Sequence, residues 1–341
     1  MTDHFAGANR RRPPRARGAA ALALLVSAAA AILADAPAGA QAPFPHRPVM
    51  LIVPYGAGGI ADTGMRIVAD KLSSKLGQQV LVDNRPGAGG IVAAKAGSSA
   101  VPDGRTLLMT GNNNAISEVL FRSLPYNILT DFASTSTTSF FDLLIVTRGD
   151  SPLKTMQDVI KAAQANPGKL NIGTINPGST QNLAAELFRS TAGINVTIVP
   201  FRTSPDMAGA ILRGDVDLAF EFYAAIQGQI LDHKIHVLAS TGSKRTAYLP
   251  DVPTVQEGGV KGYEVVSWNG ISVPAATPKP IIDTITHAIN EVLPLPDVQE
   301  KSQRLGMDMH GSTPEEMTAR MKADIAKWAA VIEKAGIPKR D

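Results

Sequence analysis

Nearly continuous apolar runs alternate with segments of helical periodicity along the chain from residue 49 onward. Apolar runs without polar interruption are typical of strands buried on both faces of a parallel sheet, because neither face then meets water. We expect strands at residues 49–55, 80–84, 106–110, 143–147, 170–175, 196–201, 216–222, 236–241 and 270–274. Helical patterns, for example 62–76 and 155–165, lie between most of these runs. The alternation predicts an α/β fold.

The last helix has the clearest start signal in the sequence. Thr313, Pro314 and Glu316 fit a capping box, in which the threonine caps the helix and the glutamate reaches back to it. An apolar stripe at helical spacing follows, and we assign it to packing rather than to a ligand. The stripe consists of Met317, Met321, Ile325, Trp328 and Ile332.

Residues 50–62 read as a strand, a glycine-rich turn and a new helix. Glycines let the backbone approach a ligand closely, and a helix N-terminus offers unpaired N–H groups and a partial positive charge. The turn therefore predicts an anion site that needs no charged side chain, although a tight turn without a ligand is the alternative. The candidate residues are Tyr55, Gly56, Ala57, Gly58, Gly59, Ile60 and Asp62.

The same turn also fits a dinucleotide-binding pattern. Gly56, Gly58 and Ala61 match the spacing G-x-G-x-x-A, and Asp83 ends the next strand, where a ribose-binding acid would be expected. A secreted NAD-dependent oxidoreductase is therefore the alternative function.

A second turn of similar chemistry follows the strand expected at 170–175 and opens a helix. Asn176, Gly178, Ser179, Thr180 and Asn182 are its candidate ligand residues. Ser179 or Thr180 either caps the helix or donates a hydroxyl to an anion, and the two interpretations remain open. Because these two helix starts lie in different halves of the chain, we expect a ligand held between two lobes.

The net charge of +3 and the sequence pI of 9.0 come from the first forty residues. Residues 1–40 contain five arginines and two aspartates, so the remainder is formally neutral. The 17 uncharged residues 18–34 precede an A-x-A pattern at Ala38 to Ala40, which is typical of an export signal cleaved near Ala40. A membrane anchor is the alternative interpretation. Nucleic acid is accordingly not an expected partner.

The chain contains no cysteine, which excludes disulfides, thiolate metal sites and a cysteine nucleophile. The sequence also lacks a G-x-S-x-G nucleophile elbow and an H-E-x-x-H metal motif. We therefore expect neither an enzyme nor a bound metal or cofactor. About 300 residues remain after the signal, which exceeds one comfortable core and favours two lobes.

Short motifs along almost the whole mature chain resemble one known family. They include Arg47, Pro48 and the strand up to Tyr55, and Asn84, Arg85 and Pro86 with the glycines after them. Further motifs lie at 102–108, 124–126, 131–133, 167–171, 214–218, 249–254 and 274–278. This series resembles the Bug family, the substrate-binding proteins of tripartite tricarboxylate transporters.

The resemblance implies a periplasmic protein of the two-lobed, type II-like "Venus flytrap" kind, with one small organic anion in the cleft. Residues 41–142 and 266–341 would form the first lobe, and residues 143–265 the second. Backbone amides of residues 55–62 and 176–182 would hold a carboxylate. Membrane permease subunits would be the partners of a monomeric binding protein, and a sensing role is the alternative to uptake.

Three residues depart from the family pattern at positions that the resemblance places in the cleft. Asn182 replaces a histidine, Arg202 replaces a lysine, and Glu221 replaces an aspartate. Arg202 would pair with a second carboxylate or lie in solvent. Glu221 would oppose a polyanion or receive an ammonium or amide group. Two further candidate ligand residues are Trp268 and Asn112. Trp268 is either a cleft wall or a core residue, and Asn112 follows the strand expected at 106–110.

Overall fold

The computed structural model describes residues 44–341, which form one compact unit. The signal expected at residues 1–40 lies outside the described residues. The strands are β1 Val49–Val53, β2 Val80–Asn84, β3 Thr106–Gly111, β4 Phe132–Arg148, β5 Asn171–Ile175, β6 Thr197–Phe201, β7 Leu218–Phe222, β8 Ile235–Ser240 and β9 Val266–Pro274. The helices are α2 Ile60–Leu76, α3 Ile91–Ser98, α4 Asn112–Leu120, α5 Met156–Ala165, α6 Thr180–Ala192, α7 Ser204–Arg213, α8 Tyr223–Leu231, α9 Lys279–Val292, α10 Pro296–Gln303 and α11 Pro314–Ala335, with a short 3-10 turn, η1, at Ala88–Gly90.

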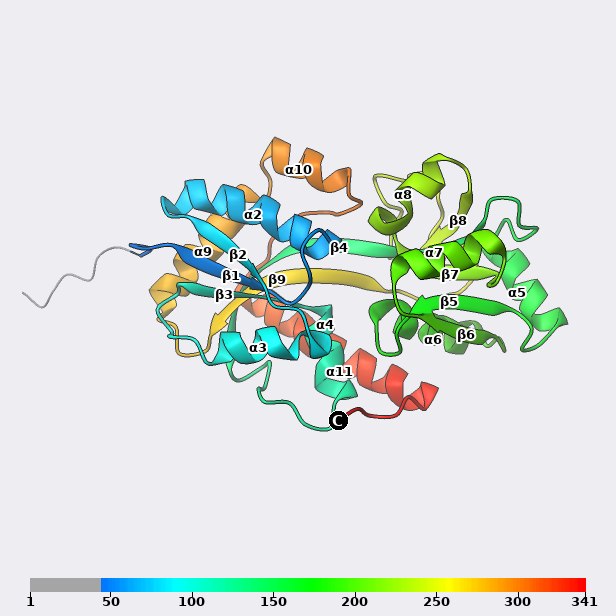
Figure 1. Cartoon of the computed structure of the whole chain (residues 1–341), viewed down its shortest axis with the longest axis horizontal. Coiled ribbons are helices and arrows are strands. Elements are labelled where there is room, and N and C mark those ends of the chain that lie inside the picture. Colours follow the sequence, from blue (N-terminus) through cyan, green and yellow to red (C-terminus); the bar gives the residue numbers. More distant parts are fainter. Residues whose placement is uncertain (1–43) are drawn as a thin grey trace, which may run out of the picture. The chain divides into compact units, whose positions relative to one another are not determined.

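The strands follow the order β2-β1-β3-β9-β4-β7-β5-β6, and β8 pairs with β4 (Figure 1). Neighbours β1, β2 and β3 are parallel, as are β5, β6 and β7, whereas β4 and β9 run antiparallel to their neighbours. The predicted α/β fold is therefore confirmed, with antiparallel strands at its centre. We call the part built on β1, β2, β3 and β9 the first lobe, and the part built on β5 to β8 the second lobe.

Strand β4 joins the two lobes because its pairing partner changes along its length. Phe132–Asp142 pair with β9, and Leu143–Val146 pair with β7 (Figure 1). The sequence analysis expected only the second part, because the first is rich in serine and threonine. Those hydroxyls are buried and bonded: Thr135 donates to the Ile271 carbonyl at 2.7 Å. The lobe boundaries at 142/143 and 265/266 stay a prediction.

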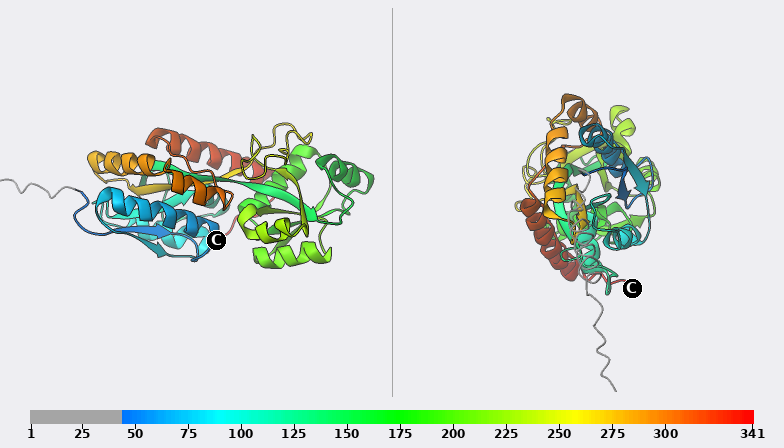
Figure 2. Two further views of the ribbon diagram at one scale, coloured as in Figure 1. Left: turned by 90° about the horizontal axis from the view of Figure 1, so that it is seen from above. Right: turned by 90° about the vertical axis from the view of Figure 1, so that its left-hand side faces the viewer.

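Helix α11 packs against α4, β4 and α6, so it contacts both lobes (Figure 2). Its capping box at Thr313 and Glu316 is present, and the predicted stripe is a packing face, with Trp328 only 1% exposed. One apolar cluster that includes Leu108, Phe188 and Trp328 runs through both lobes. Among residues 44–341, no helix combines the length and the apolar character needed to cross a bilayer.

Asp142 is the last β4 residue before the pairing changes, and its side chain meets other acidic groups. Burial, followed by the charges of Glu264 and Asp308, raises the pKa of Asp142 to about 7, although the Gly242 amide partly offsets this. After burial, the charge of Asp142 also raises the pKa of Tyr248. The folded protein therefore holds a proton on Asp142 at pH values where an unfolded chain does not.

We predict that Asp142→Asn stabilises the protein more at pH 8 than at pH 4. In the wild type, the unfolded state ionises first, so the free energy of unfolding falls as pH rises from about 4 to about 7. The asparagine removes this loss, which is about 4 kcal/mol when the pKa rises from 3.8 to about 7. Urea unfolding at both pH values measures it. Asp232→Asn, on an exposed turn, is the control, and an equal effect of Asp142→Asn at both pH values would contradict the assignment.

Candidate functional site

A cavity of about 800 Å³ lies at the carboxyl ends of β1 and β5, where loops meet the N-termini of α2 and α6. The first lobe contributes backbone-rich segments to its wall, namely Pro54, Tyr55, Gly56, Gly59, Ile60, Ala61, Pro86, Gly87, Gly89 and Gly90. Helix α4 contributes Asn113, Ile116, Ser117 and Leu120. The second lobe contributes residues 175–181 and Phe222. The carboxyl ends of strands are where α/β sheets usually bind ligands.

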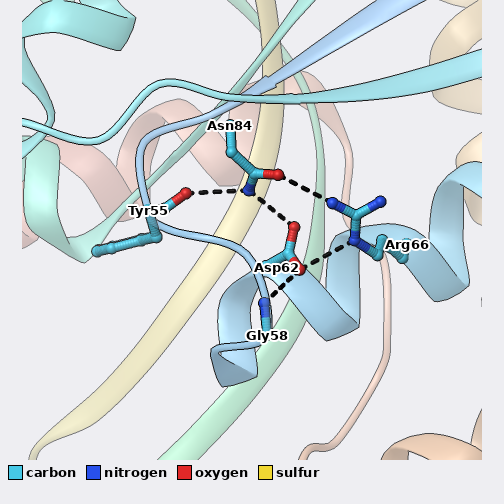
Figure 3. Close-up of polar contacts among 5 residues, drawn as sticks. All are labelled: Tyr55, Gly58, Asp62, Arg66 and Asn84. Carbon is cyan, nitrogen blue, oxygen red and sulfur yellow. Dashed lines mark hydrogen bonds and ion pairs between the residues drawn. The ribbon is translucent and has the colours of Figure 1, made fainter.

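The first turn is held in shape by a buried carboxylate, that of Asp62 in the first turn of α2 (Figure 3). The Gly58 amide donates to Asp62 Oδ2 at 2.8 Å, and Arg66 Nε donates to the same oxygen at 2.9 Å. Asn84 Nδ2 donates to Asp62 Oδ1 and to the Tyr55 carbonyl. Burial opposes ionisation of Asp62, but the bonds from Arg66, Gly58 and Asn84 outweigh it and lower the pKa.

The second turn repeats this arrangement with a neutral side chain. The Gly178 amide donates to Asn182 Oδ1 at 3.0 Å, four residues ahead, as Gly58 does to Asp62. Both glycines have positive φ angles, 86° for Gly58 and 82° for Gly178, which other residues adopt only with strain. Ser179 then caps α6 by accepting the Asn182 amide at 3.1 Å.

The first helical residues after both turns line the same cavity. The first intrahelical bonds are those of the Thr63 amide in α2 and the Leu183 amide in α6. The amides of Ile60, Ala61, Thr180 and Gln181 precede these and have no intrahelical acceptor. All four residues line the cavity. The arrangement therefore offers two sets of oriented donors, each with the partial positive charge of a helix N-terminus, to one anion.

Helix α4 contacts the second turn directly. Asn112 Nδ2 donates to Thr180 Oγ1 at 2.9 Å, and Asn112 Oδ1 accepts from Trp328 Nε1 at 2.7 Å. A Cβ atom added to Gly178 would collide with the side chain of Leu120. Asn112 therefore links both lobes to α11. Because Gly178 has no side chain, Leu120 of α4 can pack directly against the second turn.

Nine of the candidate residues from the sequence line the cavity: Tyr55, Gly56, Gly59, Ile60, Asn176, Gly178, Ser179, Thr180 and Trp268. The side chain of Trp268 is fully buried and donates from Nε1 to Asp324 at 2.6 Å, which fits a core residue, and its role as a cleft wall stays a prediction. Seven others lie outside the lining: Ala57, Gly58, Asp62, Asn112, Asn182, Arg202 and Glu221. Of these, Gly58, Asp62, Asn112 and Asn182 support the two turns through the bonds described above.

Arg202 and Glu221 are the departures whose roles the sequence left open. The Arg202 carbonyl accepts from Asn176 Nδ2 at 3.4 Å. Glu221 is fully buried, and its Oε1 accepts from Gln181 Nε2 at 3.0 Å and from the Phe222 amide at 2.8 Å. Burial raises the pKa of Glu221, although these bonds partly offset it. A role for either residue in ligand contact stays a prediction.

The sequence analysis missed most of the cavity's apolar wall and the polar residue Asn113. Phe121, directly after α4, lines the cavity together with Phe141 of β4 and Phe222 of β7. The rings of Phe141 and Phe222 meet edge to face at 5.1 Å. Asn113 follows Asn112 in a run of three asparagines after a buried strand, which is the signal that would have identified it. Asp83, the acid of the dinucleotide alternative, pairs with Arg85 at 2.8 Å and lies outside the lining. Within residues 44–341, no group of three or more acidic or histidine side chains is placed to hold a metal ion.

Comparison with known proteins points to one family. A family model described as "Tripartite tricarboxylate transporter family receptor" matches residues 65–337. The protein BugT of Bordetella pertussis is 30% identical over 308 residues, which are 88% of this chain and 94% of BugT. The structure of R. palustris Rpa4515 with adipate is 31% identical, has a TM-score of 0.77 and covers 86% of this chain and 99% of that chain. The periplasmic binding protein BugD is 29% identical, has a TM-score of 0.74 and covers 87% of this chain and all of its own.

We predict that Asp62→Ala costs about 1–3 kcal/mol of unfolding free energy, because it removes the buried carboxylate that accepts hydrogen bonds from Gly58, Arg66 and Asn84. Asp62→Asn keeps one acceptor and should cost less. The wild type should lose its higher free energy of unfolding relative to Asp62→Asn as the pH falls below the usual pKa of aspartate. The lowered pKa of Asp62 stabilises the folded protein only at pH values where the carboxylate is ionised. Urea unfolding measures both effects, and equal losses for the two variants would contradict the capping role.

Gly58 and Gly178 form a matched pair for a second test. Gly58→Ala and Gly178→Ala share the φ strain, about 1–2 kcal/mol. A Cβ at Gly58 meets open space, whereas one at Gly178 meets Leu120, so Gly178→Ala should cost more. Leu120→Ala should recover the excess in a double-mutant cycle. Equal costs for both glycines, without coupling to Leu120, would contradict the close approach of α4 to the second turn.

Proposed function

This chain belongs to the tripartite tricarboxylate transporter receptor family, the Bug proteins, and we propose that it captures a small organic carboxylate between its lobes. The carboxylate would then be delivered to the membrane permease of a tripartite transporter. Members of this family are periplasmic binding proteins. We also propose that the protein is exported through a signal cleaved near Ala40 and that it acts as a monomer.

The observation that carries the proposal is the convergence of two helix N-termini on one cavity. Their first-turn amides, at Ile60, Ala61, Thr180 and Gln181, have no intrahelical acceptors and line the cavity from both lobes. A carboxylate has two oxygens that can each accept more than one such bond. The related structure with adipate supports the same ligand chemistry for this chain.

We further propose that the lobes close on the ligand by a hinge motion. Closure excludes water from the carboxylate, which strengthens each bond to a fixed amide. The bond from Asn112 to Thr180 and the contact of Leu120 with the second turn are the interactions that closure would form between the lobes. Strand β4, which belongs to both lobes, is the structural connection about which they would turn.

Two proline substitutions test the amides individually. Ile60 and Thr180 each occupy the first position of their helix, where proline is well tolerated because its missing N–H forms no helical bond. The preceding residues are extended, with ψ of 166° at Gly59 and 160° at Ser179, as a following proline requires. Ile60→Pro and Thr180→Pro therefore remove one donor each while the helix remains.

Calorimetric titration with a carboxylate panel that includes adipate measures the result. We expect each proline variant to bind at least about tenfold more weakly than Ile60→Ala or Thr180→Ala, because a bond to a charged group contributes about 1.5–3 kcal/mol. The alanine variants control for the lost side chains. Absence of carboxylate binding in the wild type, together with thermal stabilisation by NAD, would contradict the proposal and favour an oxidoreductase.

A further inference from the structure

The C-terminal segment, residues 336–341, follows α11 and returns to the end of α4, where it reaches the cavity (Figure 1). The Arg340 amide donates to the Leu120 carbonyl at 2.9 Å, and the Arg340 carbonyl accepts from the Arg122 amide at 2.8 Å. These two bonds make a parallel β-bridge between Arg340 and Phe121. The backbone of Arg340 is therefore fixed to the end of α4, beside the cavity.

The side chain of Arg340 extends from this bridge to the second turn. Its Nη2 atom donates to the Pro177 carbonyl, and both residues line the cavity. A guanidinium carries five N–H donors, so a bond to one carbonyl leaves donors available to a ligand. Arg340 therefore presents a cation at the cavity wall, in a position set by its own backbone and by the second turn.

The charge of Arg340 is not balanced by a carboxylate of the protein. Asp341 is the acidic residue in the lining, but its Oδ1 atom lies 3.3 Å from Nε of Arg122, which lies outside the lining. Among residues 44–341, no carboxylate lies within ion-pair distance of Arg340. Arg122 and Asp341 offset each other, so Arg340 leaves one positive charge at the cavity.

Arg340 lies on the solvent side of the cavity, whereas the helix N-termini lie deeper. Arg340 is exposed, but Ala61 and Gln181, in the first turns of α2 and α6, are buried. Leu120 and Phe121 add apolar wall next to Arg340. A ligand whose first carboxylate is bound by the helix amides would therefore direct its outer end toward the guanidinium.

We propose that Arg340 is a specificity-determining residue, which binds a second carboxylate at the outer end of the ligand. A guanidinium matches a carboxylate in shape, because two parallel N–H donors can bond to the two oxygens. This proposal rests on the proposed function, since it assumes that the helix N-termini hold the first carboxylate. It assigns the recognition of the ligand's second charge to the C-terminal segment.

Dicarboxylates and their half-amides test this selectivity by calorimetric titration at neutral pH. The pairs are succinate with succinamate, glutarate with glutaramate, and adipate with adipamate. Each half-amide keeps the chain length and replaces one carboxylate by an uncharged group of similar shape. In the pair that binds most tightly, we expect the dicarboxylate to bind at least about fivefold more tightly than its half-amide. The two equivalent ends of a dicarboxylate account for about twofold of this preference.

Variants of Arg340 separate its charge from a structural role. Arg340→Gln removes the charge but keeps an amide that can donate to the Pro177 carbonyl, so the preference should fall to about twofold. Arg340→Lys keeps the charge without the planar fork and should retain part of the preference. The control is Lys339→Gln, which removes the same charge from the adjacent residue, exposed and outside the lining. It should leave the preference unchanged.

The outcomes distinguish this proposal from the proposed function. A wild-type preference of about twofold or less in every pair would overturn the second carboxylate contact and leave carboxylate capture standing. A preference that is unchanged in Arg340→Gln, or equally reduced in Lys339→Gln, would overturn the assignment to Arg340. If neither the dicarboxylates nor the half-amides bind, the proposed function falls together with this inference.

Discussion

A hydrogen bond that occurs once in each lobe organises the cleft: a glycine amide donates to a side chain four residues ahead, in the first turn of the next helix. Gly58 bonds to Asp62, and Gly178 bonds to Asn182. This bond fixes the turn in a left-handed conformation and satisfies the donor just before the helix. Ile60 and Thr180, at the first helical positions, then line the cavity, and their amides have no intrahelical acceptor.

The two turns differ in one respect that matters electrostatically. Asp62 carries a charge that opposes an anion, and Arg66 balances it, whereas Asn182 provides the same hydrogen bond without any charge. Residues 41–341 are formally neutral, so no general positive field of that part would collect anions. The proposed capture of a carboxylate would therefore depend on local dipoles.

The sequence predicted the parts of the structure that follow from local rules. Continuous apolar runs identified the buried strands, the capping box identified α11, and glycines before helices identified both turns. It did not predict the first half of β4, whose serine and threonine hydroxyls bond mainly to partners distant in the chain, such as the Ile271 carbonyl. Asn113 was missed for a similar reason: its unpaired amide becomes apparent only when Gly90 packs against it.

The most direct test of the central claim is the amide proton–nitrogen correlation spectrum of the protein on titration with a carboxylate that binds it. A hydrogen bond to a carboxylate moves an amide proton downfield. The account predicts large downfield shifts for the amides of Ile60, Ala61, Thr180 and Gln181. It predicts much smaller shifts for Gly58 and Gly178, whose amides are already bonded to Asp62 and Asn182. Downfield shifts confined to other residues would contradict the claim that these two helix N-termini hold the ligand.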